Sequence, residues 1–349
     1  MSAPKVIIKA VEPNQYSLFG FLRIYSNIPV LEKAKKILSE SSIIVDSTPI
    51  AAREMNSFQN QHSVPVVFDV DIHSLVKYSP QQISFYTTNI TRLHCDLPEG
   101  RCYNEVLHSP EKDWLCEYDA SKRIRLSCGE NPSNRDLPTY LVWWHLVLSE
   151  ITRHYGSKQD YFNWLDQQSI DYPLAIPIIK KKQSREIFFK LARERGLLED
   201  AVWSYVGDDH NPGQTLPGYS DDNEKVSHGI TSLDYIARSN LNVSLETHVD
   251  AHEAVMFTEK IFKSMASASP TLALLWPEGY QRFRELGFHL EQHHEQENRE
   301  DRIIDVVDHA ERLRYQPLPR RWANVERLFD ESQLVDQLVN CLRDVPNHL

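Results

Sequence analysis

The feature that most constrains this fold is the alternation of short apolar runs with longer stretches of helical spacing. Short apolar runs bounded by turn residues are typical of buried strands, and helical segments between them favour parallel strands joined by crossovers. The first half of the chain contains these predicted strands: Val6–Val11, Ser42–Asp46, Val64–Val70 and Gln82–Thr87. The second half contains these: Tyr172–Ile179, Ala201–Tyr205, Leu241–Glu246 and Thr271–Leu275. The sequence therefore predicts an α/β protein with mostly parallel sheets.

Stretches of helical spacing separate or follow these strands. The predicted helices are Ile28–Leu38, Gln183–Gly196, Thr258–Ser267, Tyr280–Leu286, Asp301–Leu313 and Trp322–Leu342. In the second of these, Ser184 is the predicted N-cap, and Gly196 is expected to end the helix in left-handed geometry. Thr139–His154 is apolar on nearly every face, so it is predicted to be a buried helix whose tryptophans belong to the core.

Length and composition bound the class of protein. The chain of 349 residues is long enough for two domains, which we place at 1–155 and 170–315. Hydrophobic residues make up 41 % and charged residues 25 % of the chain, as in globular proteins. The formal net charge of −11 argues against a nucleic-acid-binding protein, which normally presents a basic face. The 5 cysteines lack CxxC spacing, so neither a zinc site nor a disulfide framework is predicted.

The apolar runs also bear on where the protein works. None of them approaches the roughly 18–20 residues that a membrane-spanning helix needs. The first residues, Met1–Pro13, lack the apolar segment of a secretory signal. We therefore expect a cytoplasmic protein, and peripheral contact with a membrane surface stays compatible with that expectation.

The most informative segment contains Thr258-Glu259-Lys260, which follows a predicted strand and a loop. Thr258 can cap a helix, which places Glu259 and Lys260 in its first turn. A helix N-terminus carries partial positive charge and free N–H groups, so it suits a phosphate, and Lys260 adds a full charge. Glu259 can accept hydrogen bonds from a ribose diol. The plainer alternative is that Glu259 only favours the helix dipole and that Lys260 is solvated.

Several short pieces around this segment stand in a recognisable order. They are Ser184-Arg185, Leu191, Gly196–Leu198, Trp203–Tyr205, Phe257–Phe262 (FTEKIF), Ala268–Pro270 and Leu286–Phe288 (LGF). This ordered set resembles the donor-binding end of fucosyltransferase-like enzymes of the GT-B architecture, and of related bacterial and viral glycosyltransferases. The resemblance covers about Tyr172 to Leu313. It implies two Rossmann-like domains facing each other across a cleft, with 320–349 as a C-terminal helix that packs back on the first domain.

The resemblance also implies roles for matching residues. Arg185 and Lys260 would bind the donor phosphates, Glu259 would bind the ribose, and Thr258 would open the binding helix. Two cations from separate elements can stabilise a leaving diphosphate without a metal, so neither a metal nor a cofactor is expected.

This chain departs from the family pattern in two places. Ser269 stands before Pro270, where the family often has glycine. Extra acids and histidines precede the helix: Glu246, His248, Asp250, His252 and Glu253. Either they form a solvated loop or they face the donor sugar. Glu246, at a strand end, could hold sugar hydroxyls or act as the nucleophile of a retaining enzyme.

A second acidic cluster, Asp69, Asp71 and His73, follows the apolar run Val64–Phe68. It therefore lies at the carboxyl end of a predicted strand, where open α/β sheets bind ligands. An inverting transfer needs a carboxylate or a histidine to take the proton of the acceptor hydroxyl, and these three residues are the candidates. The alternatives are a capping or surface turn, or the Asp-x-Asp metal motif of GT-A glycosyltransferases.

Together these features predict a metal-independent glycosyltransferase that uses a nucleotide-sugar donor. The expected acceptor is a hydroxyl of a glycan or glycolipid, in the synthesis of a surface polysaccharide or glycan. Two other readings stay open. One is a metal-dependent GT-A enzyme that uses Asp69 and Asp71, and the other is a glycan- or nucleotide-binding protein without turnover.

Overall fold

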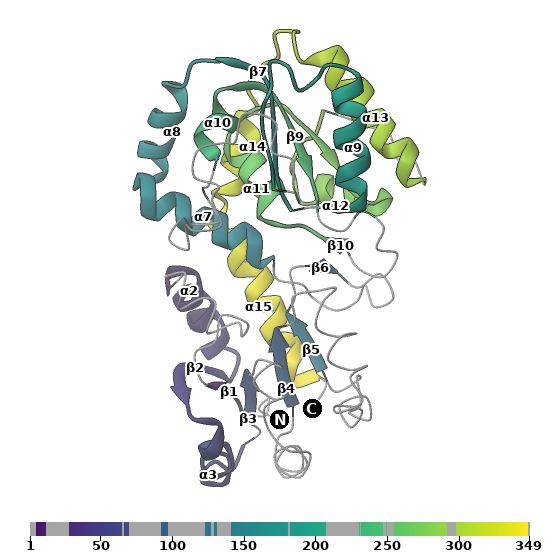
Figure 1. The fold of residues 1–349 in the computed structure, drawn as a ribbon. Coiled ribbons are helices and arrows are strands. Elements are labelled where there is room, and N and C mark those ends of the chain that lie inside the picture. The colour runs from purple at the N-terminus through teal and green to yellow at the C-terminus, as the bar shows by residue number, and fades with distance from the viewer. Residues whose placement is uncertain are drawn as a thin grey trace. The chain divides into compact units, whose positions relative to one another are not determined.

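The computed structural model describes residues 5–11, 28–64, 66–69, 92–96, 123–126, 129–130, 141–180, 182–206, 230, 232–246, 249, 255–291 and 298–347. The chain divides into two compact units (Figure 1). The first unit is Met1–Val142 with Glu331–Leu349, and the second is Trp143–Asp330. Within the described ranges, none of the helices is long and apolar enough to cross a bilayer.

The first unit is built on a parallel sheet with the strand order β2-β1-β3-β4-β5. Its strands are β1 (Val6–Val11), β2 (Ile43–Ile50), β3 (Val66–Asp69), β4 (Arg92–Asp96) and β5 (Arg123–Leu126). A further short strand, β6 (Gly129–Glu130), follows β5 in the chain. Every residue of β1 and β3 is buried, as expected for central strands of a parallel sheet.

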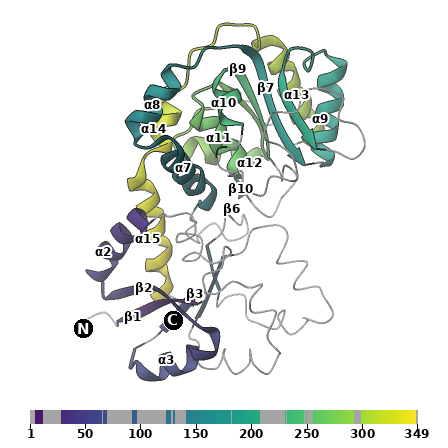
Figure 2. The ribbon, with the colours of Figure 1, turned by 60° about the vertical axis from the view of Figure 1, so that its left-hand side comes forward.

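Helices flank this sheet. They are α2 (Ile28–Ser39), the short 3₁₀ turn η1 (Ala52–Glu54), α3 (Met55–Gln61) and the C-terminal α15 (Glu331–Asn347). Figure 2 shows α15 alongside α2, and the two helices pack against each other. At their contact, Lys33 Nζ lies 2.6 Å from Glu331 Oε2. The C-terminal helix therefore belongs to the same unit as the N-terminal strands.

Strand β2 is longer than the sequence indicated. We predicted that it would end at Asp46, before Ser47-Thr48-Pro49, but it continues to Ile50, which pairs with Val11 of β1. A proline has no N–H to donate, so it is tolerated in a strand mainly at a sheet edge or at a bulge. Both conditions hold here, because β2 lies at the edge of the sheet that the described strands form, and its register with β1 shifts between Lys9 and Val11.

The second unit has a four-stranded parallel sheet in the order β11-β9-β7-β8. Its strands are β7 (Tyr172–Lys180), β8 (Val202–Val206), β9 (Ser239–Leu245) and β11 (Thr271–Leu274), with the short β10 (Val255–Met256) between the last two in the chain. Its helices are α7 (Val142–Tyr155), α8 (Lys158–Asp166), α9 (Gln183–Glu194), α10 (Leu233–Ala237), α11 (Glu259–Ala266), α12 (Pro277–Glu285), α13 (Arg299–Leu313) and α14 (Trp322–Leu328).

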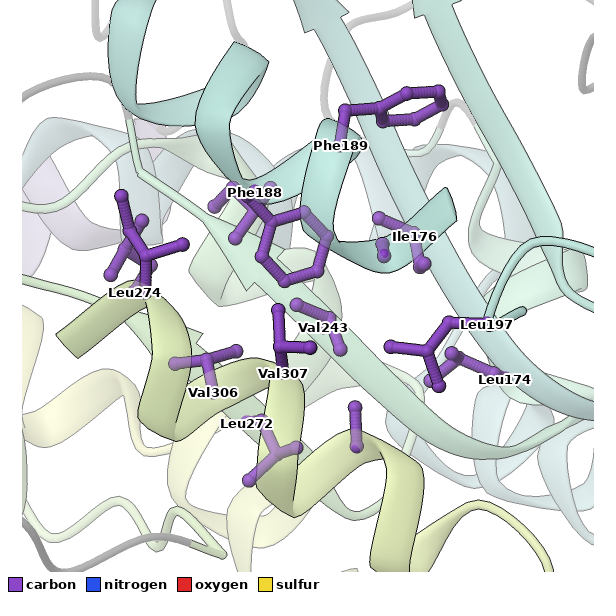
Figure 3. Packing of buried hydrophobic residues seen from close by; sticks show 14 of the residues in the cluster. Leu174, Ile176, Phe188, Phe189, Leu197, Val243, Leu272, Leu274, Val306 and Val307 are labelled. Atoms are coloured by element: carbon purple, nitrogen blue, oxygen red, sulfur yellow. The ribbon is translucent and has the colours of Figure 1, made fainter. Parts of the chain in front are cut away.

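One face of this sheet packs against α9 and α13 through an apolar core (Figure 3). Val243 and Leu274 enter this core from the strands, Phe188 from α9, and Val306 and Val307 from α13. All five side chains are buried. The helical spacing of the apolar residues in α9 and α13 explains why these two helices cover the sheet.

The opposite face of β9 is polar and meets α11. Successive side chains of a strand point to opposite faces, so Asn242 points away from the core that Val243 enters. Its Nδ2 donates to Ser264 Oγ of α11 at 2.5 Å. Every residue of α11 is buried, including its charged residues.

The predicted fold class is confirmed, because the structure contains two α/β units that are each built on a parallel sheet. Two local predictions are wrong. Lys182, not Ser184, is the N-cap of α9, and it makes no side-chain cap hydrogen bond. The predicted helix Trp322–Leu342 is two helices, α14 and α15, which fall in different units. The predicted strand Gln82–Thr87 lies outside the described residues.

Candidate functional site

In the sheet of the second unit, the connections that leave the neighbouring strands β7 and β9 run in opposite directions along the sheet. From β7 the chain passes through α9 to β8 on one side, and from β9 it passes through α11 to β11 on the other. In open α/β sheets, ligands bind outside the carboxyl ends of the strands at such a switch point. The residues that follow β7 and β9 are therefore the candidates for a binding site.

Arg185 comes from the β7 side of this point. It is the third residue of α9, and its side chain is buried at 1 % exposure. Its Nη2 donates to a backbone oxygen at 2.8 Å, that of Leu245, the last residue of β9. The guanidinium group therefore lies at the carboxyl end of β9, although its own helix follows β7.

The start of α11 comes from the β9 side. Thr258 is the N-cap, as predicted, and its Oγ1 accepts a hydrogen bond from the backbone nitrogen of Lys260 at 3.4 Å. Lys260 Nζ lies 2.5 Å from Glu259 Oε1, and both side chains are about 10 % exposed. The two groups that were predicted to meet a phosphate and a ribose thus form an ion pair with each other.

Glu246 follows β9 directly and is fully buried. Its Oε2 accepts a hydrogen bond from the backbone nitrogen of Thr258, and its Oε1 accepts one from that of Ile261, both at 3.2 Å. Burial raises the pKa of Glu246, while Lys260 and the hydrogen bond from Thr258 act in the opposite direction. Its carboxylate occupies the first turn of α11, which the sequence had suggested as a place for a phosphate.

Lys263 completes a cluster of buried charges, which we call the α11 charge cluster: Arg185, Glu246, Glu259, Lys260 and Lys263. Burial opposes the ionisation of Glu259, but Lys260 and Lys263 outweigh it and hold its pKa at about 2. Burial lowers the pKa of Lys263 to about 8, although Glu259 and Glu246 act to raise it. With three cations and two carboxylates, the cluster carries more positive than negative charge, so it favours an anion.

Two of the buried cations, Lys263 and Arg302, were not predicted from the sequence as site residues. Lys263 could have been found, because it lies one turn after Glu259 in a helix whose other late residues are small or apolar. Arg302 of α13 is 3 % exposed, and its Nη2 donates to the backbone oxygen of Val249 at 2.8 Å. Its position in the sequence gave no signal, since a charged residue near a helix start is usually solvated.

The second unit brings together five of the predicted site residues: Arg185, Glu246, Thr258, Glu259 and Lys260. In the first unit, Asp69 is buried at the end of β3, beside Ala10 of β1 in the sheet register. Asp71 and His73 lie outside the described residues, as do His248, Asp250, His252 and Glu253. Within the described part of the chain, no group of three or more His, Cys, Asp or Glu residues could hold a metal ion.

Comparison with known proteins gives the following. No family model matches the chain, and no curated protein matches it. Among solved structures, an α1,3-fucosyltransferase is similar at 11 % identity and a TM-score of 0.40, over 98 % of this chain and 91 % of that one. Its complex with GDP-fucose gives 11 % identity and a TM-score of 0.42, over 97 % and 90 %. The glycotransferase of kitacinnamycin gives 11 % identity and a TM-score of 0.29, over 99 % and 95 %.

These similar structures are glycosyltransferases, the class of enzyme that the sequence motifs resemble. At 11 % identity and TM-scores of 0.29 to 0.42, they assign neither a family nor an activity to this chain.

Proposed function

We propose that this protein is a glycosyltransferase that binds a nucleotide-sugar donor in its second unit and transfers the sugar to a hydroxyl of a glycan or glycolipid. The observation that carries the proposal is the α11 charge cluster, a buried excess of positive charge at the switch point of a parallel sheet. Such a cluster fits the diphosphate of an activated sugar, and the motifs around it resemble those of glycosyltransferases.

The cations of the cluster would act on the leaving group. When the bond between the sugar and the diphosphate breaks, negative charge builds up on the phosphate oxygens. Lys260 and Arg185 come from separate helices, so they can contact the diphosphate from two sides and stabilise that charge. Once donor binding has moved Lys260 from Glu259 to the phosphate, both cations lie in place before the bond breaks, so little reorganisation is needed during the reaction. This arrangement requires no metal ion.

Glu259 would hold the nucleoside. Its carboxylate, kept ionised by Lys260 and Lys263, accepts hydrogen bonds from the two ribose hydroxyls. Donor binding then replaces the Lys260–Glu259 ion pair by two ligand contacts, one with the phosphate and one with the ribose. The buried charges stay compensated throughout the exchange, which keeps its free-energy cost low.

The acceptor hydroxyl must lose a proton as it attacks the sugar. The candidates for this general base belong to the first unit: Asp69, which ends strand β3, and Asp71 and His73, which come next in the sequence. Replacing the responsible carboxylate by its amide, in Asp69→Asn or Asp71→Asn, should lower turnover and leave donor affinity nearly intact.

A binding and turnover experiment tests this proposal. The purified protein is titrated calorimetrically with GDP, UDP and CMP, with and without Mg²⁺, and release of nucleotide from the matching sugar conjugates is then measured. We expect one nucleotide to bind without metal and its sugar conjugate to be turned over. Binding only with Mg²⁺ would instead favour the metal-dependent reading through Asp69 and Asp71. Binding without turnover of any sugar conjugate would favour a non-catalytic nucleotide-binding protein.

A further inference from the structure

Both oxygens of the Glu246 carboxylate are occupied by hydrogen bonds from the protein backbone, although the residue lies beside a candidate active site. Both of its oxygens accept backbone hydrogen bonds from the first turn of α11, one from Thr258 and one from Ile261. Its side chain is fully buried. A carboxylate at this place favours the helix dipole and satisfies N–H groups that have no partner within the helix. The contacts of Glu246 are therefore those of a capping group supplied by a distant part of the chain.

A second contact fixes α11 on the same strand. Asn242 lies four residues before Glu246. Because side chains an even number of residues apart along a strand point to the same face of the sheet, both side chains lie on the same face. Asn242 Nδ2 donates to Ser264 Oγ at 2.5 Å, and Ser264 Oγ donates to the backbone oxygen of Lys260 at 2.9 Å. The polar face of β9 thus holds α11 at two points, one at its first turn and one at its second.

The two amides that Glu246 binds flank the proposed ligand-binding residues. Glu259 and Lys260 lie between Thr258 and Ile261 in the chain, so fixing the backbone at both neighbours fixes the direction of both side chains. We propose that Glu246 is a positioning residue of the donor site: it holds the first turn of α11 so that Glu259 and Lys260 meet the nucleotide, and it does not contact the sugar. The identity of the ligand, a nucleotide, rests on the proposed function. The hydrogen bonds of Glu246 to α11 are independent of it.

The role differs from the two that the sequence suggested for Glu246, namely holding sugar hydroxyls or attacking the sugar as a nucleophile. Either of those roles needs an oxygen directed at the sugar. Here both oxygens face the backbone of α11. The positioning role therefore predicts that Glu246 matters for binding a nucleoside diphosphate, which has no sugar beyond its ribose.

Hydrogen exchange tests the positioning role without any ligand. Exchange of backbone amides in the segment 257–266 is measured for the natural protein, Glu246→Gln and Glu246→Ala. Gln keeps one acceptor oxygen and nearly the same volume, and Ala keeps none. We expect exchange in this segment to speed up by about tenfold in Glu246→Gln and by about a hundredfold in Glu246→Ala, because charge-assisted hydrogen bonds are lost stepwise. Unchanged exchange in Glu246→Gln would overturn the inference.

Affinity provides the second measurement. GDP and UDP are titrated against the same variants, and kcat and KM are measured with the corresponding sugar conjugate. We expect the Kd of the nucleoside diphosphate and the KM of the sugar conjugate to rise by the same factor, about tenfold for Glu246→Gln, with kcat falling much less. A nucleophile or sugar-binding residue would do the reverse: kcat would collapse while the Kd of the nucleoside diphosphate stayed unchanged.

The matched control is Glu150→Gln in α7. Glu150 is also a buried glutamate of the second unit, 4 % exposed, and its carboxylate lies 3.3 Å from Arg153. This variant should lower the melting temperature and leave nucleotide affinity and exchange in 257–266 unchanged. If Glu246→Gln behaved in the same way, its role would be stability alone and the inference would be wrong. If the natural protein bound none of GDP, UDP and CMP, the proposed function would fail, and the exchange result would still decide the role of Glu246.

Discussion

The Lys260 ammonium has two competing partners in the proposed mechanism. One is the Glu259 carboxylate, 2.5 Å away in the structure, and the other is the diphosphate of the donor. The two partners differ in how many charges they offer, since a diphosphate carries more negative charge than one carboxylate. Arg185 lies near the Glu246 carboxylate and Lys263 lies near the Glu259 carboxylate. Both carboxylates therefore keep a positive neighbour when Lys260 moves to the diphosphate, which favours that move.

Lys260→Ala tests this preference. Losing one charge-assisted contact in a largely buried site should weaken binding of a nucleoside diphosphate by about 2–3 kcal/mol. Calorimetric titration of the natural protein and the variant measures the difference. Lys190→Ala is the control, because Lys190 lies on α9 of the same unit with a side chain that is 77 % exposed. Equal affinities of natural protein and Lys260→Ala would remove Lys260 from the donor site.

Lys263 should make the stability of the protein depend on pH in the alkaline range. Burial lowers its pKa from 10.5 to about 8 in the folded protein. Between these values the unfolded chain binds more protons than the folded one, so the free energy of unfolding rises with pH. Relative to Lys263→Met, the natural protein should therefore gain stability from pH 8 to pH 10 in urea unfolding, by an amount that tracks this pKa difference.

The control for this measurement is Lys190→Met, which removes an exposed lysine and should leave the pH dependence of the natural protein intact. A constant difference between the natural protein and Lys263→Met across this pH range would mean that Lys263 stays protonated in the folded state. The buried charge would then be fully compensated by Glu259 and Glu246.

Gly196 and Gly287 both follow helix ends in left-handed geometry, and they differ in what surrounds them. Gly196 has φ +64°, and a Cβ there would meet Glu199 Oε1 at 3.5 Å, which is ordinary contact. Gly287 has φ +87°, and a Cβ there would meet Arg327 Nε at 2.8 Å. That nitrogen donates to the backbone oxygen of Leu286 at 2.6 Å, so the arginine cannot move away without losing a hydrogen bond.

Alanine at each position should separate backbone strain from steric conflict. Gly196→Ala should cost about 1 kcal/mol of unfolding free energy, because it introduces strain alone. Gly287→Ala should cost about 1 kcal/mol more, because the Arg327 hydrogen bond to the end of α12 is also disturbed. Urea unfolding of both variants measures the difference. Equal costs would show that Arg327 adapts without loss.

Many of the helices and strands could be predicted, because their apolar residues form short runs in the strands and follow helical spacing in the helices. β1 has the predicted bounds, and α11 begins at the predicted cap, Thr258. Pattern alone failed where the deciding fact was tertiary. Pro49 stays in β2 because β2 is an edge strand with a register shift. The apolar pattern from Trp322 to Leu342 is continuous, yet Val325 and Leu328 are buried in one unit and Leu334 and Leu338 in the other.

The site could be predicted in part for a similar reason. Motif resemblance pointed to Arg185, Glu259 and Lys260, and the fold gathers them at one sheet edge. The actual contacts could not be predicted. Glu246 reaches amides that lie 12 and 15 residues further along the chain, and Arg185 reaches a backbone oxygen 60 residues away. Such contacts depend on how the helices lie against the sheet, which short motifs do not encode.

Each unit has its own parallel sheet, and the chain passes between the units at two places. Val142 and Trp143 mark the first passage, and Asp330 and Glu331 mark the second. The proposed donor site lies wholly within the second unit as described. Ligand binding to that unit should therefore stabilise it directly and leave the first unit's own stability unchanged.

Calorimetric unfolding can test this separation. Asp46→Asn would leave the Lys9 ammonium, 5 % exposed in β1, without the carboxylate that lies 2.6 Å from it, so it should lower the unfolding temperature of the first unit. A saturating nucleoside diphosphate should raise the unfolding temperature of the second unit by an amount that grows with ligand concentration. We expect two transitions that respond separately, and Lys260→Ala should reduce the ligand's effect at a given ligand concentration without moving the transition that Asp46→Asn lowers. A single transition that both changes shift would mean that the two units unfold as one cooperative body, in which case donor binding would stabilise the first unit as well.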